Sequence, residues 1–176
     1  MKKKRIYLVG FMGAGKSTLG KQLSKELKWR LYDTDEIIVG NYGPIGEIFS
    51  TQGEAYFRDI ESKLVRSLVN PPFVMATGGG TACFKNNMDF MLEHGTVVFL
   101  KISKELFLYR LKKDPAIIQR PLLKKKTDKE LIELYESRLH HYQRAHITHD
   151  AMEQTDLLIE KIRFYEHKGR GAESSE

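Results

Sequence analysis

The chain has 176 residues, with 29 Lys or Arg against 23 Asp or Glu and a formal net charge of +6. Hydrophobic residues make up 41% and charged residues 30%, which excludes a chain disordered throughout and suits one globular domain with its own core. Cys83 is the single cysteine, so no intrachain disulfide forms, and no apolar run reaches the roughly 18 residues of a membrane helix. We therefore expect a cytoplasmic protein whose positive charge favours an anionic partner: nucleic acid, nucleotide or acidic metabolite.

Short apolar segments alternate with amphipathic segments along the chain. The pattern predicts strands at residues 6–9, 31–32, 73–76, 96–102 and 147–149. It predicts helices at residues 17–28, from about 36, at 54–69, from 104, at 127–145 and from about 153. This alternation indicates an α/β domain with a parallel sheet covered on both faces. We expect a single domain over residues 1–166, followed by a flexible tail at 167–176.

Residues 10–17 (GFMGAGKS) fit the phosphate-loop pattern G-x-x-x-x-G-K-[ST], or P-loop. Glycines let the backbone wrap around phosphate oxygens, and the N-terminus of the following helix attracts negative charge. A chance glycine-rich turn is the alternative, but the strand before the loop and the helix after it favour the P-loop. The lysine then reaches the β- and γ-phosphates, and the serine hydroxyl ligates Mg²⁺. We expect nucleotide contacts from Gly13, Ala14, Gly15, Lys16, Ser17 and Thr18.

The class of P-loop protein is narrowed by what the sequence lacks. It contains neither D-x-x-G nor N-K-x-D, which argues against a GTPase switch. The third predicted strand ends in Thr77 and three glycines, whereas a motor ATPase is expected to place a Mg²⁺-holding Asp at such a strand end. A compact kinase remains, with its substrate beside the nucleotide.

Two carboxylates, Asp33 and Asp35, follow the second predicted strand. The carboxyl ends of parallel strands face the ligand crevice, where the P-loop also lies. One carboxylate can sit near Mg²⁺ and its waters while the other accepts a proton from an attacking hydroxyl. The alternative for Asp35 is an N-cap of the helix expected to begin near Glu36.

Two arginines, Arg58 and Arg138, lie on predicted helices, Arg58 near the start of one and Arg138 at the edge of an apolar helix face. Each has an ordinary alternative to a functional role, a surface ion pair with a nearby glutamate. The partners would be Glu54 or Glu61 for Arg58, and Glu133 or Glu136 for Arg138.

A long connection between two predicted helices carries Arg120 and the lysines at 124–126. Its length is unusual for a loop without function, and its charges suit a cover over phosphates. We therefore expect a lid at about residues 113–127.

Together these motifs, in this order, resemble the shikimate kinase family. The matching pieces are GFMGAGKST at 10–18, DTD at 33–35, the pair at 57–58, TGGG at 77–80, RPLL at 120–123, and Arg138. The resemblance covers residues 6–162. It implies a three-layer P-loop kinase fold with a five-stranded parallel sheet of order 2-3-1-4-5, a substrate-binding segment at about 34–70 and a lid. The implied reaction is the Mg²⁺-dependent conversion of ATP and shikimate to ADP and 3-phosphoshikimate, on the route to chorismate.

On the substrate side, the resemblance implies that Asp35 binds the shikimate hydroxyls and is the candidate base. It implies that Arg58 and Arg138 clamp the carboxylate, with the bidentate geometry of guanidinium. The backbone of Gly79 and Gly80 would approach the ring, and Phe49 and Phe57 would wall the pocket.

On the phosphate side, the resemblance implies that Lys16 and Arg120 stabilise the transferring phosphoryl group. Ser17 would be the direct Mg²⁺ ligand, and Asp33 would act on the metal through water. Arg110 would lie on the adenine side, with Arg120 also contacting the nucleotide.

Other assignments remain as alternatives. A gluconate or nucleoside monophosphate kinase would share the P-loop and lid, and a nucleic-acid-binding ATPase would use the basic surface. A metal site among His140, His141, His146 and His149 and a nucleophilic role for Cys83 are both less favoured than packing or solvation. We expect a monomer with shikimate as its small-molecule partner and with neither nucleic acid nor membrane.

Overall fold

The computed structural model describes residues 4–68, 70–113 and 126–171. Its centre is a five-stranded parallel sheet of order β2-β3-β1-β4-β5, which confirms the predicted topology. The strands are β1 (Arg5–Val9), β2 (Arg30–Asp33), β3 (Phe73–Ala76), β4 (Thr96–Lys101) and β5 (Ile147–Asp150).

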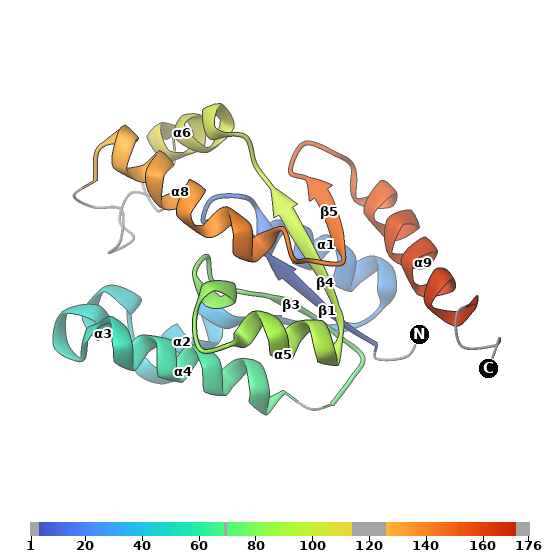
Figure 1. Ribbon diagram of the computed structural model, residues 1–176. Helices are drawn as coiled ribbons and strands as arrows, with labels where there is room; N and C mark the ends of the chain where they lie inside the picture. The colour runs from blue at the N-terminus through green and yellow to red at the C-terminus, as the bar shows by residue number, and fades with distance from the viewer. Residues whose placement is uncertain (1–3, 69, 114–125, 172–176) are drawn as a thin grey trace.

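Helices cover both faces of the sheet (Figure 1). The helices α1 and α9 pack against each other on one side, and α5 and α8 lie on the other. The helices α2, α3 and α4 form a group of their own beside the sheet. The bounds are α1 (Lys16–Leu27), α2 (Thr34–Tyr42), α3 (Ile45–Thr51), α4 (Gly53–Ser67), the 3₁₀ turn η1 (Thr81–Cys83), α5 (Asn87–His94), α6 (Lys104–Lys113), α8 (Asp128–Tyr142) and α9 (Thr155–Gly171).

The hydrophobic core has two parts. The larger part surrounds the sheet, where the side chains of β1, β3 and β4 are buried on both faces, as expected for a covered parallel sheet. The smaller part joins α2, α3 and α4 through Ile38, Ile48, Phe57 and Ile60. The predicted substrate-binding segment therefore packs around a small core of its own, next to the main sheet.

Several boundaries differ from the sequence-based expectation. The helices α3 and α5 were not predicted, because helices of seven and eight residues are too short to show a clear 3.6-residue period. The helix α2 begins at Thr34, earlier than expected. The helix α9 continues to Gly171, past the expected boundary at Glu166, and the rest of the predicted tail lies outside the described residues.

The topology gathers three segments at one edge of the sheet. The P-loop follows β1, Asp33 ends β2, and the residues from Thr77 to Gly80 follow β3. Because β2, β3 and β1 are adjacent and parallel, these three segments lie side by side at the carboxyl edge. This edge is where the sequence analysis placed the ligand crevice.

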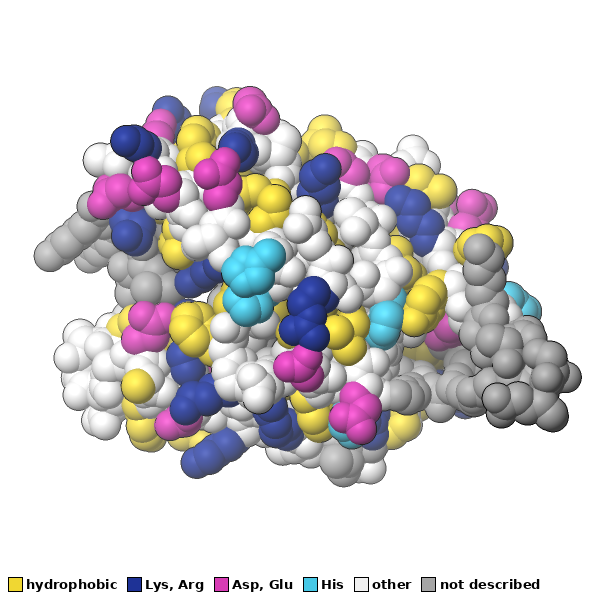
Figure 2. Space-filling view, viewed as in Figure 1, with side chains coloured by type: hydrophobic (Ala, Val, Ile, Leu, Met, Phe, Trp, Pro, Cys, Tyr) yellow, Lys and Arg dark blue, Asp and Glu magenta, His cyan; other side chains and the backbone are white. Residues whose placement is uncertain are grey.

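Charged side chains of both signs are mixed on the face shown in Figure 2. The structure contains exposed ion pairs, such as Lys85 with Asp59 and Lys104 with Glu136. The positive charge is therefore not gathered into a basic stripe on this face. In the described part of the chain, no helix combines the length and the apolar character needed to cross a bilayer.

Candidate active site

The P-loop forms an anion-binding turn around the side chain of Lys16. Gly15 caps α1 in the left-handed region with a φ of 101°. The Lys16 ammonium is buried and donates hydrogen bonds to the carbonyl oxygens of Gly10 at 2.8 Å and Phe11 at 2.9 Å. A buried cation at a helix N-terminus attracts phosphate oxygens strongly. The loop therefore fits the predicted nucleotide site.

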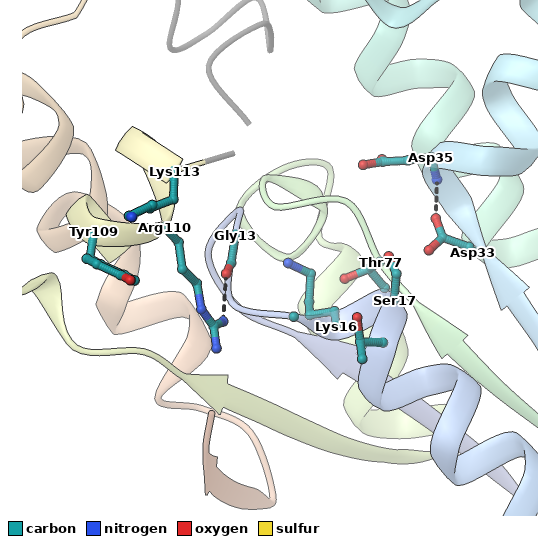
Figure 3. Close-up of a pocket in the computed structure, with 11 residues that line it drawn as sticks. Gly13, Lys16, Ser17, Asp33, Asp35, Thr77, Tyr109, Arg110 and Lys113 are labelled. Carbon is teal, nitrogen blue, oxygen red and sulfur yellow. Dashed lines mark hydrogen bonds between the residues drawn. The ribbon is translucent and has the colours of Figure 1, made fainter. Parts of the chain in front are cut away.

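A cavity of about 340 Å³ opens beside the P-loop (Figure 3). Four segments far apart in sequence line it: the P-loop with the start of α1, the end of β2, the end of β3, and α6. Its polar lining suits a phosphate group with a metal ion. The lining residues are Gly13, Gly15, Lys16, Ser17, Thr18, Asp33, Asp35, Thr77, Tyr109, Arg110 and Lys113.

Arg110 joins α6 to the P-loop. Its Nη1 donates hydrogen bonds to the carbonyl oxygens of Gly13 and Ala14, both at 3.0 Å. Arg110 also lines a neighbouring cavity of about 430 Å³, which lies between the P-loop and the turn from β5 to α9. It thus lies between the two cavities, a position that fits its predicted place on the nucleotide side.

The two carboxylates after β2 have different environments. Asp33 is buried and caps α2, because its Oδ1 accepts the backbone N–H groups of Asp35 at 3.1 Å and Glu36 at 3.3 Å. The N-cap role considered for Asp35 therefore belongs to Asp33. The Asp35 side chain points from the first turn of α2 into the cavity (Figure 3).

Arg58 is buried inside a cage of carboxylates and aromatic rings. Only 4% of it is exposed, and it pairs with Glu54 at 2.9 Å and Glu61 at 2.8 Å. Its guanidinium lies 4.4 Å from the ring centre of Phe84. Both pairings that spacing allowed as the alternative are present, but they are buried and not at the surface.

Glu61 is fully buried behind Arg58. Burial raises the pKa of the Glu61 carboxyl, although Arg58 and the hydroxyl of Thr81 lower it. Thr81 donates a hydrogen bond of 2.5 Å to Glu61. Spacing suggested Glu61 as a partner of Arg58, but no sequence signal indicated its contact with Thr81.

Arg138 is also buried, and it differs from Arg58 in its partners. Its guanidinium lies over the ring of Phe11 in the P-loop. Its Nη1 has no hydrogen-bond partner within the described residues. The surface pairs considered for it are absent there, since Glu133 pairs with Lys129 and Glu136 pairs with Lys104. A buried guanidinium with an unused donor can bind an anion.

The glycine loop from Gly78 to Gly80 brings these groups together. A Cβ on Gly78 would lie 2.8 Å from Oδ1 of Asp35, and a Cβ on Gly80 would lie 2.7 Å from Nη2 of Arg58. A Cβ on Gly79 would lie 2.9 Å from the backbone nitrogen of Met12. These approaches are far closer than side chains allow. Asp35, Arg58 and the P-loop therefore all lie directly against this loop.

Several predicted residues do not line this cavity, among them Arg58, Gly79, Gly80 and Arg138. Phe49 and Phe57 pack together, with ring centres 5.0 Å apart, in the small core of α2 to α4. Arg120 and most of the predicted lid lie outside the described residues. Conversely, Tyr109 lines the cavity although no sequence signal marked it.

The structure also describes the residues of two less favoured assignments, a nucleophilic Cys83 and a metal site among the histidines. Burial raises the pKa of the Cys83 thiol, which disfavours a nucleophilic thiolate. His146 accepts the backbone N–H of Val97 at 3.1 Å and stacks on Tyr165. The described residues hold no cluster of His, Cys, Asp or Glu side chains that suits a metal ion.

Comparison with known proteins identifies the family. A family profile described as shikimate kinase matches residues 12–164. The chain belongs to the shikimate kinase family. A shikimate kinase from Sulfurihydrogenibium sp. is 42% identical over 162 residues, which span 90% of this chain and 95% of the relative.

Solved shikimate kinases also share the fold. The structure from Bacteroides thetaiotaomicron is 34% identical, with a TM-score of 0.82 over 90% of this chain and 98% of its own. The Acinetobacter baumannii enzyme, solved in complex with shikimate, is 32% identical, with a TM-score of 0.79 over 93% of both chains. A gluconokinase from Sinorhizobium meliloti is only 14% identical, so its TM-score of 0.61 shows the shared P-loop kinase fold alone.

Proposed function

We propose that this chain transfers the γ-phosphoryl group of ATP to the 3-hydroxyl of shikimate, giving ADP and 3-phosphoshikimate. As a shikimate kinase family member it is an ATP-dependent, Mg²⁺-requiring kinase of aromatic amino acid biosynthesis. The observation that carries the residue assignment is the convergence of Asp35, Arg58 and the P-loop on the glycine loop. A hydroxylated carboxylic acid matches these groups, because it offers both an anion and hydroxyls.

The phosphate side of the site fits ATP and Mg²⁺ because the P-loop encloses a buried ammonium beside hydroxyl and carboxylate side chains. Lys16 and the first N–H groups of α1 would hold the phosphates, and the Ser17 hydroxyl would ligate the metal. Asp33 would act on the metal through water, since one of its oxygens caps α2. When bound, Mg²⁺ supplies positive charge to the phosphate oxygens.

The acceptor side is built to hold shikimate by its two ends. The Arg138 guanidinium, with its unused donor, would bind the carboxylate together with Arg58. Asp35 would accept a hydrogen bond from the 3-hydroxyl and orient that group for in-line attack. Because phosphoryl transfer has a loose transition state, placement and charge contribute more than the basicity of Asp35. Arg120 remains a prediction from the family resemblance.

A coupled assay of ADP release tests the proposal. The purified chain is supplied with ATP and Mg²⁺, then with shikimate, gluconate or AMP as acceptor. We expect turnover with shikimate and none above background with the other two. Absence of shikimate-dependent ADP release would refute the proposed function. We also expect Asp35→Asn to lose most of the turnover, about 10²-fold or more, and near-normal turnover would remove Asp35 from its role.

The finer properties of the protein are proposals as well. We infer a cytoplasmic monomer that binds neither nucleic acid nor membrane, with one domain over residues 1–166 and a substrate-binding segment at 34–70. On the face shown in Figure 2, charges of both signs are mixed, so this face does not form the basic patch typical of nucleic-acid binding. Light scattering on the purified chain tests the monomer, and ATP hydrolysis unaffected by DNA or RNA tests the absence of nucleic-acid binding.

A further inference from the structure

Tyr142 connects α8 to the glycine loop. It is the last residue of α8 and is fully buried. Its hydroxyl donates a hydrogen bond of 2.5 Å to the carbonyl oxygen of Gly79, which lies 63 positions earlier in the chain. The same helix carries Arg138, one turn before Tyr142. The phenol therefore links the helix of one substrate-side arginine to the loop that packs against the other.

The Tyr142 hydroxyl keeps its proton for this bond. Burial raises the pKa of Tyr142 well above its usual value, and the neighbouring Cys83 raises it further, whereas Arg138 lowers it. A phenol that stays protonated has a single proton to donate. That proton goes to the Gly79 carbonyl oxygen.

A fixed Gly79 carbonyl also fixes the next N–H group. A peptide unit is planar, and the bond from Gly79 to Gly80 is trans, since the one cis bond among the described residues joins Pro71 and Pro72. In a trans peptide the N–H of the second residue points opposite to the C=O of the first. With the Gly79 C=O directed at α8, the Gly80 N–H is directed away from α8.

The Gly80 N–H is a donor without an internal acceptor. Among the described residues it donates to no backbone or side-chain oxygen. Gly80 also packs directly on the guanidinium of Arg58. The guanidinium already donates to Glu54 and Glu61, so the Gly80 N–H is the donor here that an acceptor oxygen of a bound ligand can take up.

We propose that Tyr142 is a positioning residue for the acceptor site, which orients the peptide between Gly79 and Gly80 toward bound shikimate and holds that loop against the helix of Arg138. This inference rests on the proposed function. Tyr142 does not touch the reacting atoms and acts through Gly79 and Gly80. Its loss is therefore expected to weaken shikimate binding while leaving the nucleotide side intact.

Tyr135 provides a matched control on the same helix. It is also buried, and its hydroxyl also donates to a backbone carbonyl oxygen, that of Ile102 at 2.9 Å. Ile102 follows β4 and does not belong to the glycine loop. Replacing either tyrosine by phenylalanine removes one buried hydrogen bond and keeps the ring. The two variants thus share a structural cost and differ in the loop they affect.

The experiment compares Tyr142→Phe and Tyr135→Phe in the full chain with the wild type. It measures KM for shikimate, KM for ATP, the calorimetric Kd for shikimate and the thermal midpoint. For Tyr142→Phe we expect KM and Kd for shikimate to rise about five- to tenfold, as the loss of one hydrogen bond implies, with KM for ATP within about twofold of wild type. For Tyr135→Phe we expect both KM values within about twofold of wild type and a similar fall in midpoint.

Three outcomes would overturn the inference: unchanged shikimate KM and Kd in Tyr142→Phe, an equal rise of both KM values in that variant, or the same selective loss in Tyr135→Phe. The wild-type measurement separates a failure of the proposed function from a failure of the role of Tyr142. A wild type without shikimate turnover refutes the proposed function. A wild type that turns over shikimate, combined with an unaffected Tyr142→Phe, refutes only the role of Tyr142.

Discussion

At the scale of single residues, the two buried arginines of the site are held in opposite ways. Arg58 is neutralised by Glu54 and Glu61, whereas one donor of Arg138 has no protein partner in the described part of the chain. Removing one partner of a buried ion pair strongly destabilises the folded protein, because the other charge is left buried and unpaired. A buried group with an unused donor already costs desolvation free energy in the folded protein, so its removal costs less. The two arginines therefore share a predicted ligand but differ in what they contribute to stability.

This difference predicts a trade-off at Arg138. We expect Arg138→Met to raise the KM for shikimate by about tenfold or more, because a charged hydrogen bond to the carboxylate is lost. The free energy of unfolding without ligand should stay the same or rise, since Met fills the site without a polar group. Steady-state kinetics and urea unfolding measure the two effects. Arg144→Met, at an exposed arginine paired with Asp89, is the control for both.

Arg58→Met should behave differently, because it leaves Glu61 buried without its cation. We expect a loss of about 3–5 kcal/mol in the free energy of unfolding, together with weaker shikimate binding. Urea unfolding of the ligand-free variant measures the loss. Equal stability of the Arg58 and Arg138 variants would contradict the assignment of different partners.

His149 predicts a pH dependence of stability. It is buried beside the second cavity, with Nδ1 3.0 Å from Oε2 of Glu153. Burial lowers the pKa of His149, although the carboxylates of Glu153 and Asp150 raise it and Lys161 lowers it. The unfolded chain therefore binds a proton more readily than the folded protein. This contribution to stability is present above the unfolded pKa of about 6.5 and is lost as pH falls through the folded value.

We expect His149→Gln to reduce the slope of stability against pH below about 6.5. Urea unfolding of both proteins at a series of pH values between about 8 and about 5 measures that slope. Parallel curves for the variant and the wild type would show that His149 does not contribute. The difference in unfolding free energy between the two proteins at the highest pH, where His149 is neutral in both states, is the reference for the values at lower pH.

At the scale of elements, the glycine loop after β3 contacts every other element that contributes to the proposed acceptor site. Three elements meet it: the P-loop through Met12, α2 through Asp35 and α4 through Arg58. A fourth, α8, reaches it through Tyr142. Such close approach requires residues without side chains, so the loop is sensitive to the smallest substitution. The distances between the P-loop, α2, α4 and α8 at the site therefore depend on how closely each of them packs against the glycine loop.

Gly80→Ala should therefore disrupt the acceptor site. The added methyl group would meet the Arg58 guanidinium, so we expect shikimate turnover to fall by about 10²-fold, the effect of misplacing a substrate by about 1 Å. Binding of ADP, measured by calorimetry, should change little. Gly40→Ala is the matched control, because Gly40 is an exposed position in α2 with open space around it. There we expect a gain of about 0.5–1 kcal/mol in stability and normal kinetics.

At the scale of the whole molecule, the sheet and its helices present two cavities that share the P-loop. The larger core holds the strands, and the small core joins α2, α3 and α4, the segment proposed to bind the acceptor. The nucleotide and shikimate should therefore each stabilise the folded protein by binding to it and not to the unfolded chain. Both ligands together should therefore raise the free energy of unfolding more than either alone, because both sites exist only in the folded state.

Thermal unfolding with ligands tests this expectation. ADP with Mg²⁺ and shikimate should each raise the thermal midpoint, with about 2.7 kcal/mol of stabilisation when the ligand is present at a hundred times its Kd. Shikimate should give little shift in Arg138→Met, whereas ADP should act as in the wild type. A shikimate shift retained in full by that variant would place the carboxylate elsewhere.

The sequence by itself determined the P-loop, the strands and the long helices, because these depend on local features. Glycine spacing, apolar runs and 3.6-residue periodicity act within a few residues, and family resemblance supplied the order of the strands. The helices α3 and α5 were missed because they are too short to show a period. Asp33 at the end of β2 and Asp35 in the first turn of α2, both candidates from the sequence, do lie at the cavity.

Only the tertiary structure decided how the candidate groups are partnered. Spacing allowed an ion pair for either arginine, but burial depends on which face of a helix packs against the rest of the chain. The N-cap moved from Asp35 to Asp33 because α2 begins directly at the end of β2. The bond from Tyr142 to Gly79 joins positions 63 apart, so no local pattern contains it. The composition indicated an anionic ligand without saying where it binds, and the packing of α4 and α8 decided that Arg58 and Arg138 are buried.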